Sequence, residues 1–229
     1  MNHWEVLGEA KIPGGGAMQL YRRGEELSIR VDRRELMNSR VHGSEDALAA
    51  QAFQRLGIRP APRVLIGGLG MGFTLAAALR GLPKDGRAVV AELVPEVVTW
   101  NQGPIGPVAG QPLADPRVAV RVADVADVLR EAAAAFDVIL LDVDNGPEAF
   151  TKAGNDRLYS PSGLAATRQA LTPGGVVGWW SAFPSPTFGP QLGRAGFVFD
   201  EVRVRERGDK GARHTLWFAT PTGGRAKRR

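Results

Sequence analysis

The glycine-rich residues 67–72 have the spacing of a loop that binds a nucleotide or a nucleoside. They follow the apolar residues 64–66 and precede residues 73–79, so a buried strand, a tight turn and a helix are predicted in succession. Glycines let a ligand approach the backbone closely, and the free N–H groups at the start of a helix attract polar or anionic atoms. We therefore expect backbone contacts to a ligand from three glycines, Gly68, Gly70 and Gly72.

Glu92 ends the next apolar run, residues 88–91, and lies twenty residues beyond Gly72. A carboxylate at the end of that strand can accept hydrogen bonds from both hydroxyl groups of a ribose. The glycines alone are also compatible with an ordinary strand-to-helix turn. The acid at the end of the following strand favours a ligand that contains a nucleoside.

Carboxylates also follow two later apolar runs. Residues 118–122 lead to Asp124, and the run 137–142, typical of a strand buried on both faces, ends in Asp142. Asp144 follows two residues later. If the molecule that reacts at this edge is an amine, Asp142 or Asp144 could take its proton or orient its lone pair, so both are catalytic candidates. The structural alternative is that Asp142 only accepts hydrogen bonds from backbone N–H groups of its loop.

Strands and helices alternate along the chain from residue 64 onward, and they determine where these side chains lie. Five strand–helix repeats are followed by two strands joined by a turn at residues 208–211. This order predicts an α/β, Rossmann-like fold, with a mostly parallel seven-stranded sheet, helices on both faces and an antiparallel strand near the C-terminus. Ligands of such sheets bind beyond the carboxyl ends of the strands, so the glycines and the acids are expected along one rim.

Hydrophobic periodicity and turn residues predict where the individual elements lie. Residues 103–116, rich in glycine and proline, are expected to form an irregular loop. Helices are expected over residues 47–56, 95–100, 125–136, 162–171 and 188–195, and later strands over residues 176–180, 197–204 and 214–219.

The helix expected at residues 47–56 begins with a group of polar side chains. Ser44 is expected to cap it, with Glu45 and Asp46 in the first turn. One interpretation is that the two acids only complement the helix dipole. The other is that they form an acidic rim with Asp142 and Asp144, which would suit a cationic substrate. His42 is interpreted as structural.

The first part of the chain does not follow the α/β pattern. Residues 18–23 and 27–32 alternate apolar and polar side chains around a turn, which predicts a hairpin. Residues 1–35 are therefore assigned to a small N-terminal β-hairpin appendage, residues 36–221 to the α/β domain and residues 222–229 to a basic, disordered tail.

Composition excludes several classes of protein. The 229 residues include no cysteine, which excludes disulfides, zinc–thiolate sites and cysteine nucleophiles, and no metal site is expected. Four positive charges of the net +5 lie in the last five residues, so the rest is nearly balanced and nucleic-acid binding is not expected. No apolar run approaches the ~20 residues that span a bilayer, and the N-terminus is no signal peptide. The expected location is the cytoplasm.

The arrangement resembles the class I S-adenosylmethionine-dependent methyltransferases and, within them, the spermidine synthase-like family, over about residues 27–219. Residues 68–72 resemble the family's glycine loop, and Ala91-Glu92-Leu93 resembles its ribose-binding strand end. Ala123-Asp124-Val125 resembles the segment whose aspartate contacts the adenine amino group. Residues 136–142 with Asn145-Gly146-Pro147 resemble its catalytic strand and loop, and Leu171-Thr172-Pro173-Gly174-Gly175 resembles the turn before its fifth strand.

The resemblance implies which residues bind which group. The ligand is expected to be S-adenosylmethionine or its decarboxylated form. It would be bound by Gly68, Gly70, Gly72, Glu92, Leu93, Asp124 and Val125, with Glu45, Asp46 and Tyr159 assigned to the acceptor substrate.

Three departures separate this sequence from the aminopropyltransferases. Met71 aligns with an aspartate that holds the amine of the decarboxylated donor, and Gly43-Ser44-Glu45 aligns with a Tyr-His-Glu segment at the polyamine site. The catalytic loop is also shorter by about two residues.

The function expected from the sequence is methyl transfer to a small acceptor, for which a cation would be suitable. Aminopropyl transfer by a spermidine synthase is the alternative, and a catalytically silent adenosyl-binding protein is a further one. The expected partner is a small-molecule acceptor, with no nucleic acid and no membrane, and a homodimer is left open.

Overall fold

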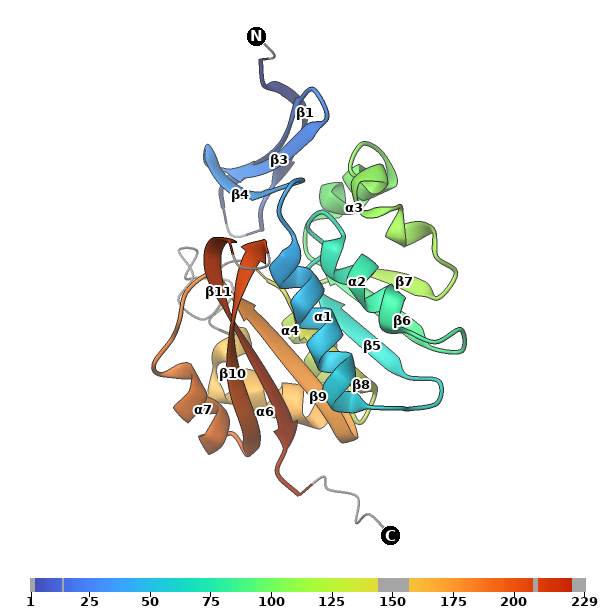
Figure 1. Cartoon of the computed structure of the whole chain (residues 1–229), viewed down its shortest axis with the longest axis vertical. Coiled ribbons are helices and arrows are strands. Elements are labelled where there is room, and N and C mark those ends of the chain that lie inside the picture. The colour runs from blue at the N-terminus through green and yellow to red at the C-terminus, as the bar shows by residue number, and fades with distance from the viewer. Residues whose placement is uncertain (1–2, 14, 144–156, 208–209, 224–229) are drawn as a thin grey trace.

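A seven-stranded sheet forms the centre of the protein (Figure 1). The computed structural model describes residues 3–13, 15–143, 157–207 and 210–223. The order across the sheet is β10-β11-β9-β8-β5-β6-β7, with β5 to β9 parallel and β11 antiparallel to both of its neighbours. The predicted fold class is therefore confirmed. The strands are β5 (Arg63–Gly67), β6 (Arg87–Glu92), β7 (Val118–Val122), β8 (Phe136–Leu141), β9 (Leu171–Ser181), β10 (Phe197–Arg207) and β11 (Lys210–Pro221).

Helices cover both faces of this sheet because successive strand residues point to opposite sides. In β5, Val64 and Ile66 pack into one apolar cluster, whereas Leu65 belongs to the other. The first cluster includes side chains of α1 (Gly43–Leu56), α2 (Phe73–Gly81) and α3 (Pro95–Gln102). The second includes side chains of α4 (Val125–Glu131), α6 (Pro161–Ala170) and α7 (Phe188–Arg194).

Several predicted boundaries are wrong, and each has a local cause. The helix predicted to reach residue 136 ends at Glu131, because Ala134 has a positive φ of 44° and Phe136 already starts β8. The strand β9 begins at Leu171 and passes through the proline and glycines that were expected to form a turn. His42, not Ser44, precedes the first turn of α1, and its side chain makes no capping hydrogen bond. The loop expected at residues 103–116 contains two short 3-10 helices, η1 (Gly106–Ala109) and η2 (Pro112–Ala114).

The N-terminal region forms a second, four-stranded antiparallel sheet, larger than the predicted hairpin. Its strands, in spatial order, are β1 (Glu5–Lys11), β2 (Ala17–Arg23), β3 (Glu26–Val31) and β4 (Arg34–Asn38). Leu20 and Ile29 of this sheet belong to the same apolar cluster as α1 to α3, and Trp100 of α3 packs against Gly8. The small sheet therefore shares its core with the α/β domain, and Figure 1 shows it above one end of that domain. Within the described ranges, no helix is both long and apolar enough to cross a bilayer.

Candidate functional site

Backbone hydrogen bonds join the carboxyl ends of neighbouring strands into one rim. The Gly68 N–H donates to the Ala91 carbonyl over 2.9 Å, and the Asp142 N–H donates to the Gly67 carbonyl over 3.0 Å. The Ala123 N–H donates to the carbonyl of Glu92 over 2.9 Å. The structure thus brings the glycine loop and the acidic ends of β6, β7 and β8 together.

The glycine loop has a backbone that other residues would not readily adopt. Gly68, Gly70 and Gly72 have φ values of 85°, 52° and 82°, all in the left-handed region. A Cβ atom on Gly68 would lie 2.4 Å from the carbonyl oxygen of Asp142, so the loop also needs glycine for space. Gly72 directly precedes α2, which places the free N–H groups of that helix beside the loop.

Asn101, which the sequence did not single out, donates a hydrogen bond to the backbone of the glycine loop. Its side-chain amide donates to the carbonyls of Gly70 and Val97 over 2.8 and 2.9 Å, and only 3% of the residue is exposed. Its Oδ1 has no hydrogen-bond partner in the described part of the chain and faces Gly72. The sequence signal that could have identified Asn101 is its position four residues after Val97, which places a polar side chain on the apolar side of α3.

Glu92 accepts a hydrogen bond from the backbone of the same loop. Its Oε2 accepts from the Leu69 N–H and its Oε1 from the Val94 N–H, both over 2.8 Å. Burial raises the pKa of this carboxyl group, and the surrounding backbone N–H groups oppose that shift. A carboxylate has about four lone-pair sites, and these two hydrogen bonds occupy two of them. Beside it, Leu93 is 42% exposed and offers an apolar surface to a flat base.

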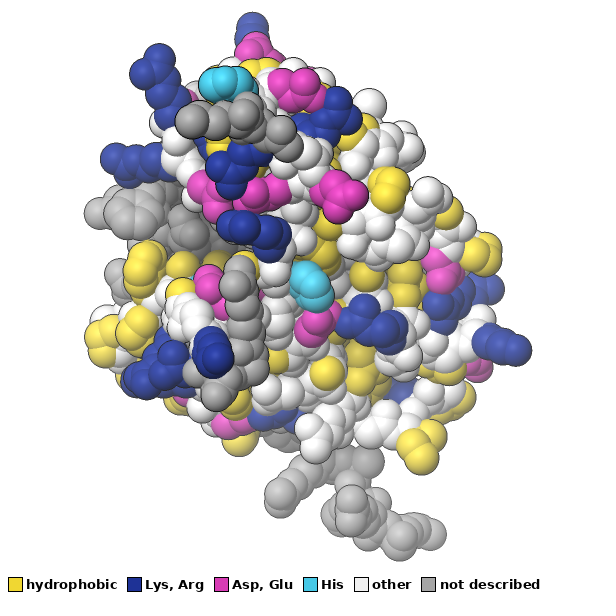
Figure 2. All heavy atoms as spheres, turned by 45° about the horizontal axis from the view of Figure 1, so that its top comes forward, with side chains coloured by type: hydrophobic (Ala, Val, Ile, Leu, Met, Phe, Trp, Pro, Cys, Tyr) yellow, Lys and Arg dark blue, Asp and Glu magenta, His cyan; other side chains and the backbone are white. Residues whose placement is uncertain are grey.

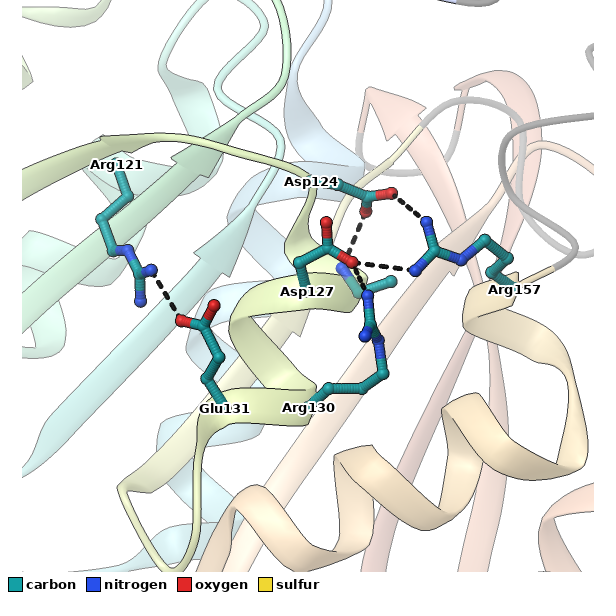
Figure 3. A network of polar contacts seen from close by, with 7 residues as sticks. Arg121, Asp124, Asp127, Arg130, Glu131 and Arg157 are labelled. Carbon is teal, nitrogen blue, oxygen red and sulfur yellow. Dashed lines mark hydrogen bonds and ion pairs between the residues drawn. The ribbon is translucent and has the colours of Figure 1, made fainter.

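Asp124 lies at the start of α4 and has structural partners (Figure 3). Its Oδ1 accepts from the Ala126 N–H over 2.8 Å, and its Oδ2 lies 3.5 Å from Arg157. The same arginine donates to Asp127 over 2.8 Å. Its neighbour Val125 is buried against Gly67, so its side chain packs in the core behind the rim.

Glu45 and Asp142 form the acidic side of the rim. Asp142 Oδ2 accepts from the hydroxyl of Thr74 in α2, and Glu45 Oε2 accepts from the hydroxyl of Ser44, both over 2.5 Å. Glu45 is only 8% exposed, and no described basic side chain forms an ion pair with it. Burial, together with the negative charge of Asp142, raises the pKa of Glu45 to about 7. We refer to these two residues as the acid pair.

Asp46 has different partners from Glu45, its neighbour in α1. It accepts from His42 Nδ1 over 2.9 Å and forms an ion pair with Arg80. The ring of His42 stacks on Phe73 at 4.5 Å between centroids. The structure therefore gives Asp46 a structural environment and leaves Glu45 as the acid of α1 that interacts with the end of β8.

Tyr159 and Asp144 are the remaining two residues predicted for the site. Tyr159 packs edge-to-face on Phe188, with 5.5 Å between ring centroids. Asp144 lies outside the described residues, as do Asn145-Gly146-Pro147 and most of the basic tail.

Charge of one sign does not dominate this face of the molecule. Figure 2, in which the top of Figure 1 comes forward, shows acidic and basic side chains interleaved. The acid pair is therefore a local feature. In the described ranges, no group of three or more metal-ligating side chains could hold a metal ion.

A cavity of about 180 Å³ lies between α3 and the two 3-10 helices. It includes Asn101 but none of the residues predicted to bind the donor or the acceptor. Its lining is Asn101, Gln102, Gly103, Gly106, Gln111, Leu113 and Ala114.

Comparisons with known proteins identify the fold. No model of a protein family matches the sequence, and no curated protein matches it either. The structure is similar to spermidine synthase from Thermotoga maritima, with a TM-score of 0.73, 18% identity and coverage of 93% of this chain and 72% of that one. A spermidine synthase in complex with the transition state analogue AdoDATO gives a TM-score of 0.72 at 18% identity, covering 93% of this chain and 71% of that one. The resemblance noted in the sequence is thus confirmed for the fold.

Proposed function

We propose that this chain transfers an alkyl group from an adenosyl sulfonium donor to a cationic amine, and that the group is aminopropyl. The observation that carries the proposal is the acid pair beside the glycine loop. The pair combines a buried carboxyl group, Glu45, with the carboxylate at the end of β8. Two acids that interact in a partly desolvated site attract a cation strongly.

The donor would lie along the glycine loop. Glu92 has lone pairs left for the ribose hydroxyls, and exposed Leu93 can cover one face of the adenine. The left-handed glycines leave the loop backbone accessible to the rest of the donor.

The chemistry needs little beyond orientation and the removal of one proton. The amine nitrogen attacks the carbon next to the sulfonium, a C–N bond forms, and the C–S bond breaks with its electron pair going to sulfur. The nitrogen must present a lone pair, so a carboxylate takes its proton. Glu45 is suited to this task because its pKa of about 7 allows it to gain and lose a proton near neutrality. Asp142, held by Thr74, orients the amine.

Charge favours the decarboxylated donor over S-adenosylmethionine. Both molecules carry a sulfonium and an ammonium group, but the intact donor adds a carboxylate, which the acid pair would repel. The similarity of the fold to spermidine synthases supports the same choice. This reading was the alternative in the sequence analysis, and the comparisons favour it over methyl transfer.

Methyl transfer remains the second candidate because of one specific feature. No residue of the glycine loop, residues 67–72, carries a carboxylate that could hold the terminal amine of a decarboxylated donor. Met71, which aligns with such an aspartate, is fully buried and contributes its side chain to the core.

Mass spectrometry of the products tests the proposal. The purified protein is incubated with S-adenosylmethionine or decarboxylated S-adenosylmethionine, together with 1,3-diaminopropane, 1,4-diaminobutane or spermidine. We expect methylthioadenosine and an aminopropylated amine from the decarboxylated donor. Adenosylhomocysteine and a methylated amine would select the second candidate. No product from any pair would overturn group transfer to these amines and favour a silent adenosyl-binding protein.

A further inference from the structure

Met37, at the edge of the N-terminal sheet, lies directly against the glycine loop. A Cβ atom built on Gly70 would lie 2.7 Å from Met37 Cε and 2.9 Å from its Sδ. The side chain belongs to β4, one of the two edge strands of its sheet, and is partly exposed. A thioether therefore occupies the space beside the glycine at the middle of the loop.

The other described groups that contact the loop are neutral or acidic. The Asn101 amide donates to the Gly70 carbonyl, and the Glu92 carboxylate accepts from the Leu69 N–H. Asp142 lies at the end of the neighbouring strand, where its carbonyl oxygen approaches Gly68. Within the described residues, no arginine or lysine side chain donates a hydrogen bond to residues 67–72.

We propose that Met37 is a specificity-determining residue that disfavours a carboxylate on the donor's sulfonium substituent. The inference rests on the proposed function, because it assumes that the donor lies along the glycine loop. A carboxylate pressed against a thioether loses water and gains no partner, which is costly. A chain of methylene groups packs well against methionine, whose side chain is flexible and polarizable. An ammonium group at the end of that chain remains compatible with the acid pair.

The proposal gives the N-terminal sheet a role in recognition. Met37 is held in place because its strand pairs with β3, where Met37 faces Ile29, a fully buried residue of the shared core. The wall beside Gly70 is thus supplied by a part of the chain that precedes the α/β domain.

Calorimetric titration of three ligands tests this role without any need for turnover. The ligands are S-adenosylmethionine, decarboxylated S-adenosylmethionine and methylthioadenosine, which lacks the amine-bearing chain. The proteins are the wild type, Met37→Arg, Met37→Glu and the apolar control Met37→Leu. We expect Met37→Arg to shift the ratio of the two donor dissociation constants by about tenfold toward S-adenosylmethionine, the size of one charge-assisted hydrogen bond. Met37→Glu should shift the ratio the other way, and Met37→Leu should leave it unchanged.

Methylthioadenosine separates the possible failures. Its affinity should stay the same in every folded variant, because it does not reach the side chain of residue 37. If methylthioadenosine and both donors fail to bind the wild type, the proposed function is wrong and the inference falls with it. If they bind but neither charged variant changes the donor ratio, the role of Met37 is overturned while the proposed function stands. Equal losses for all three ligands would also overturn it, since a merely structural residue would behave in that way. Either charged variant alone decides the matter if the other does not fold.

Discussion

The two ends of the rim use their carboxylates in different ways. On the proposed donor side, Glu92 accepts hydrogen bonds from two backbone N–H groups, and Asp124 caps α4 while lying next to Arg157. On the proposed acceptor side, Glu45 receives a hydrogen bond from the Ser44 hydroxyl, and its pKa is raised to about 7. Burial raises the pKa of both glutamates, but backbone N–H groups oppose the shift at Glu92, whereas the negative charge of Asp142 adds to it at Glu45.

This difference indicates what each side is built to bind. A carboxylate fixed by N–H groups offers its remaining lone pairs in a defined direction, as recognition of neutral hydroxyls requires. A buried carboxyl group without a cationic partner lowers the stability of the protein once it ionises, and a bound cation would relieve that cost. The acceptor side is therefore suited to a positively charged ligand, and four substitutions test the contrast.

Asp142→Asn should have the largest effect. The amide keeps the shape of the side chain but removes the charge that orients the amine, so turnover should fall by roughly 10²-fold, the cost of lost positioning, with donor affinity within a few-fold. Steady-state kinetics and donor titration measure the two quantities. Thr74→Val, which removes only the hydroxyl that donates to Asp142, is the matched control and should cost less. A variant as active as the wild type but less heat-stable would mean that Asp142 only supports its loop.

Glu45→Gln should stabilise the protein, and only at neutral and alkaline pH. The pKa of Glu45 is raised from 4.5 to about 7, so the folded state holds this proton more tightly than the unfolded chain does. The wild type thus loses stability as pH rises from about 4.5 to about 7, by about 3 kcal/mol in total. Urea unfolding at about pH 8 should show the variant to be more stable by an amount of this order. The difference should vanish near pH 4.5, and a gain that does not depend on pH would contradict the assignment.

Glu92→Gln should weaken adenosyl binding by about tenfold or more, the value of a charge-assisted hydrogen bond. The glutamine has one acceptor oxygen, so one of the two N–H groups at Leu69 and Val94 also loses its partner. Glu92→Ala would leave both N–H groups unpaired and should lower stability as well. Titration with methylthioadenosine, combined with thermal unfolding, separates the two losses. Unchanged affinity in a folded Gln variant would remove Glu92 from the ribose site.

Asp124→Asn should have the smallest effect. Asparagine is as good a helix cap as aspartate, and the ion pair with Arg157 is exposed, so the free energy of unfolding should change by less than about 1 kcal/mol. Donor affinity should change by no more than a few-fold. A large loss of donor affinity, with Arg157→Ala remaining normal, would show that the contribution of Asp124 to adenine binding exceeds its structural one.

The parallel sheet was predictable because buried strands are continuous apolar runs that end in polar residues. Residues 64–66 and 137–141 have this pattern, and the rule that ligands bind beyond the carboxyl ends then placed Glu92 and Asp142 on one rim. The first turn of α1, with Glu45 in it, also followed from local helix signals.

The contacts that distinguish the two sides of the rim could not be predicted, because they join residues far apart in the chain. Met37 lies against Gly70 only because the N-terminal sheet packs on the shared core. Arg157 reaches Asp124 across 33 positions. The neighbours Glu45 and Asp46 have nearly the same local sequence context, yet only Asp46 accepts a hydrogen bond from His42 and forms an ion pair with Arg80.

Calorimetric binding of 1,4-diaminobutane to the complex with methylthioadenosine tests the central claim most directly. At about pH 7 the wild type should bind the diamine and release a proton, because the bound cation lowers the pKa of Glu45 from its raised value. Titrations in two buffers of different ionisation enthalpy measure that proton. Glu45→Gln should bind without proton release, and Asp142→Asn should bind more weakly. Diamine binding that is indifferent to both substitutions, or no diamine binding by the wild type, would contradict the assignment of the acid pair to a cationic acceptor.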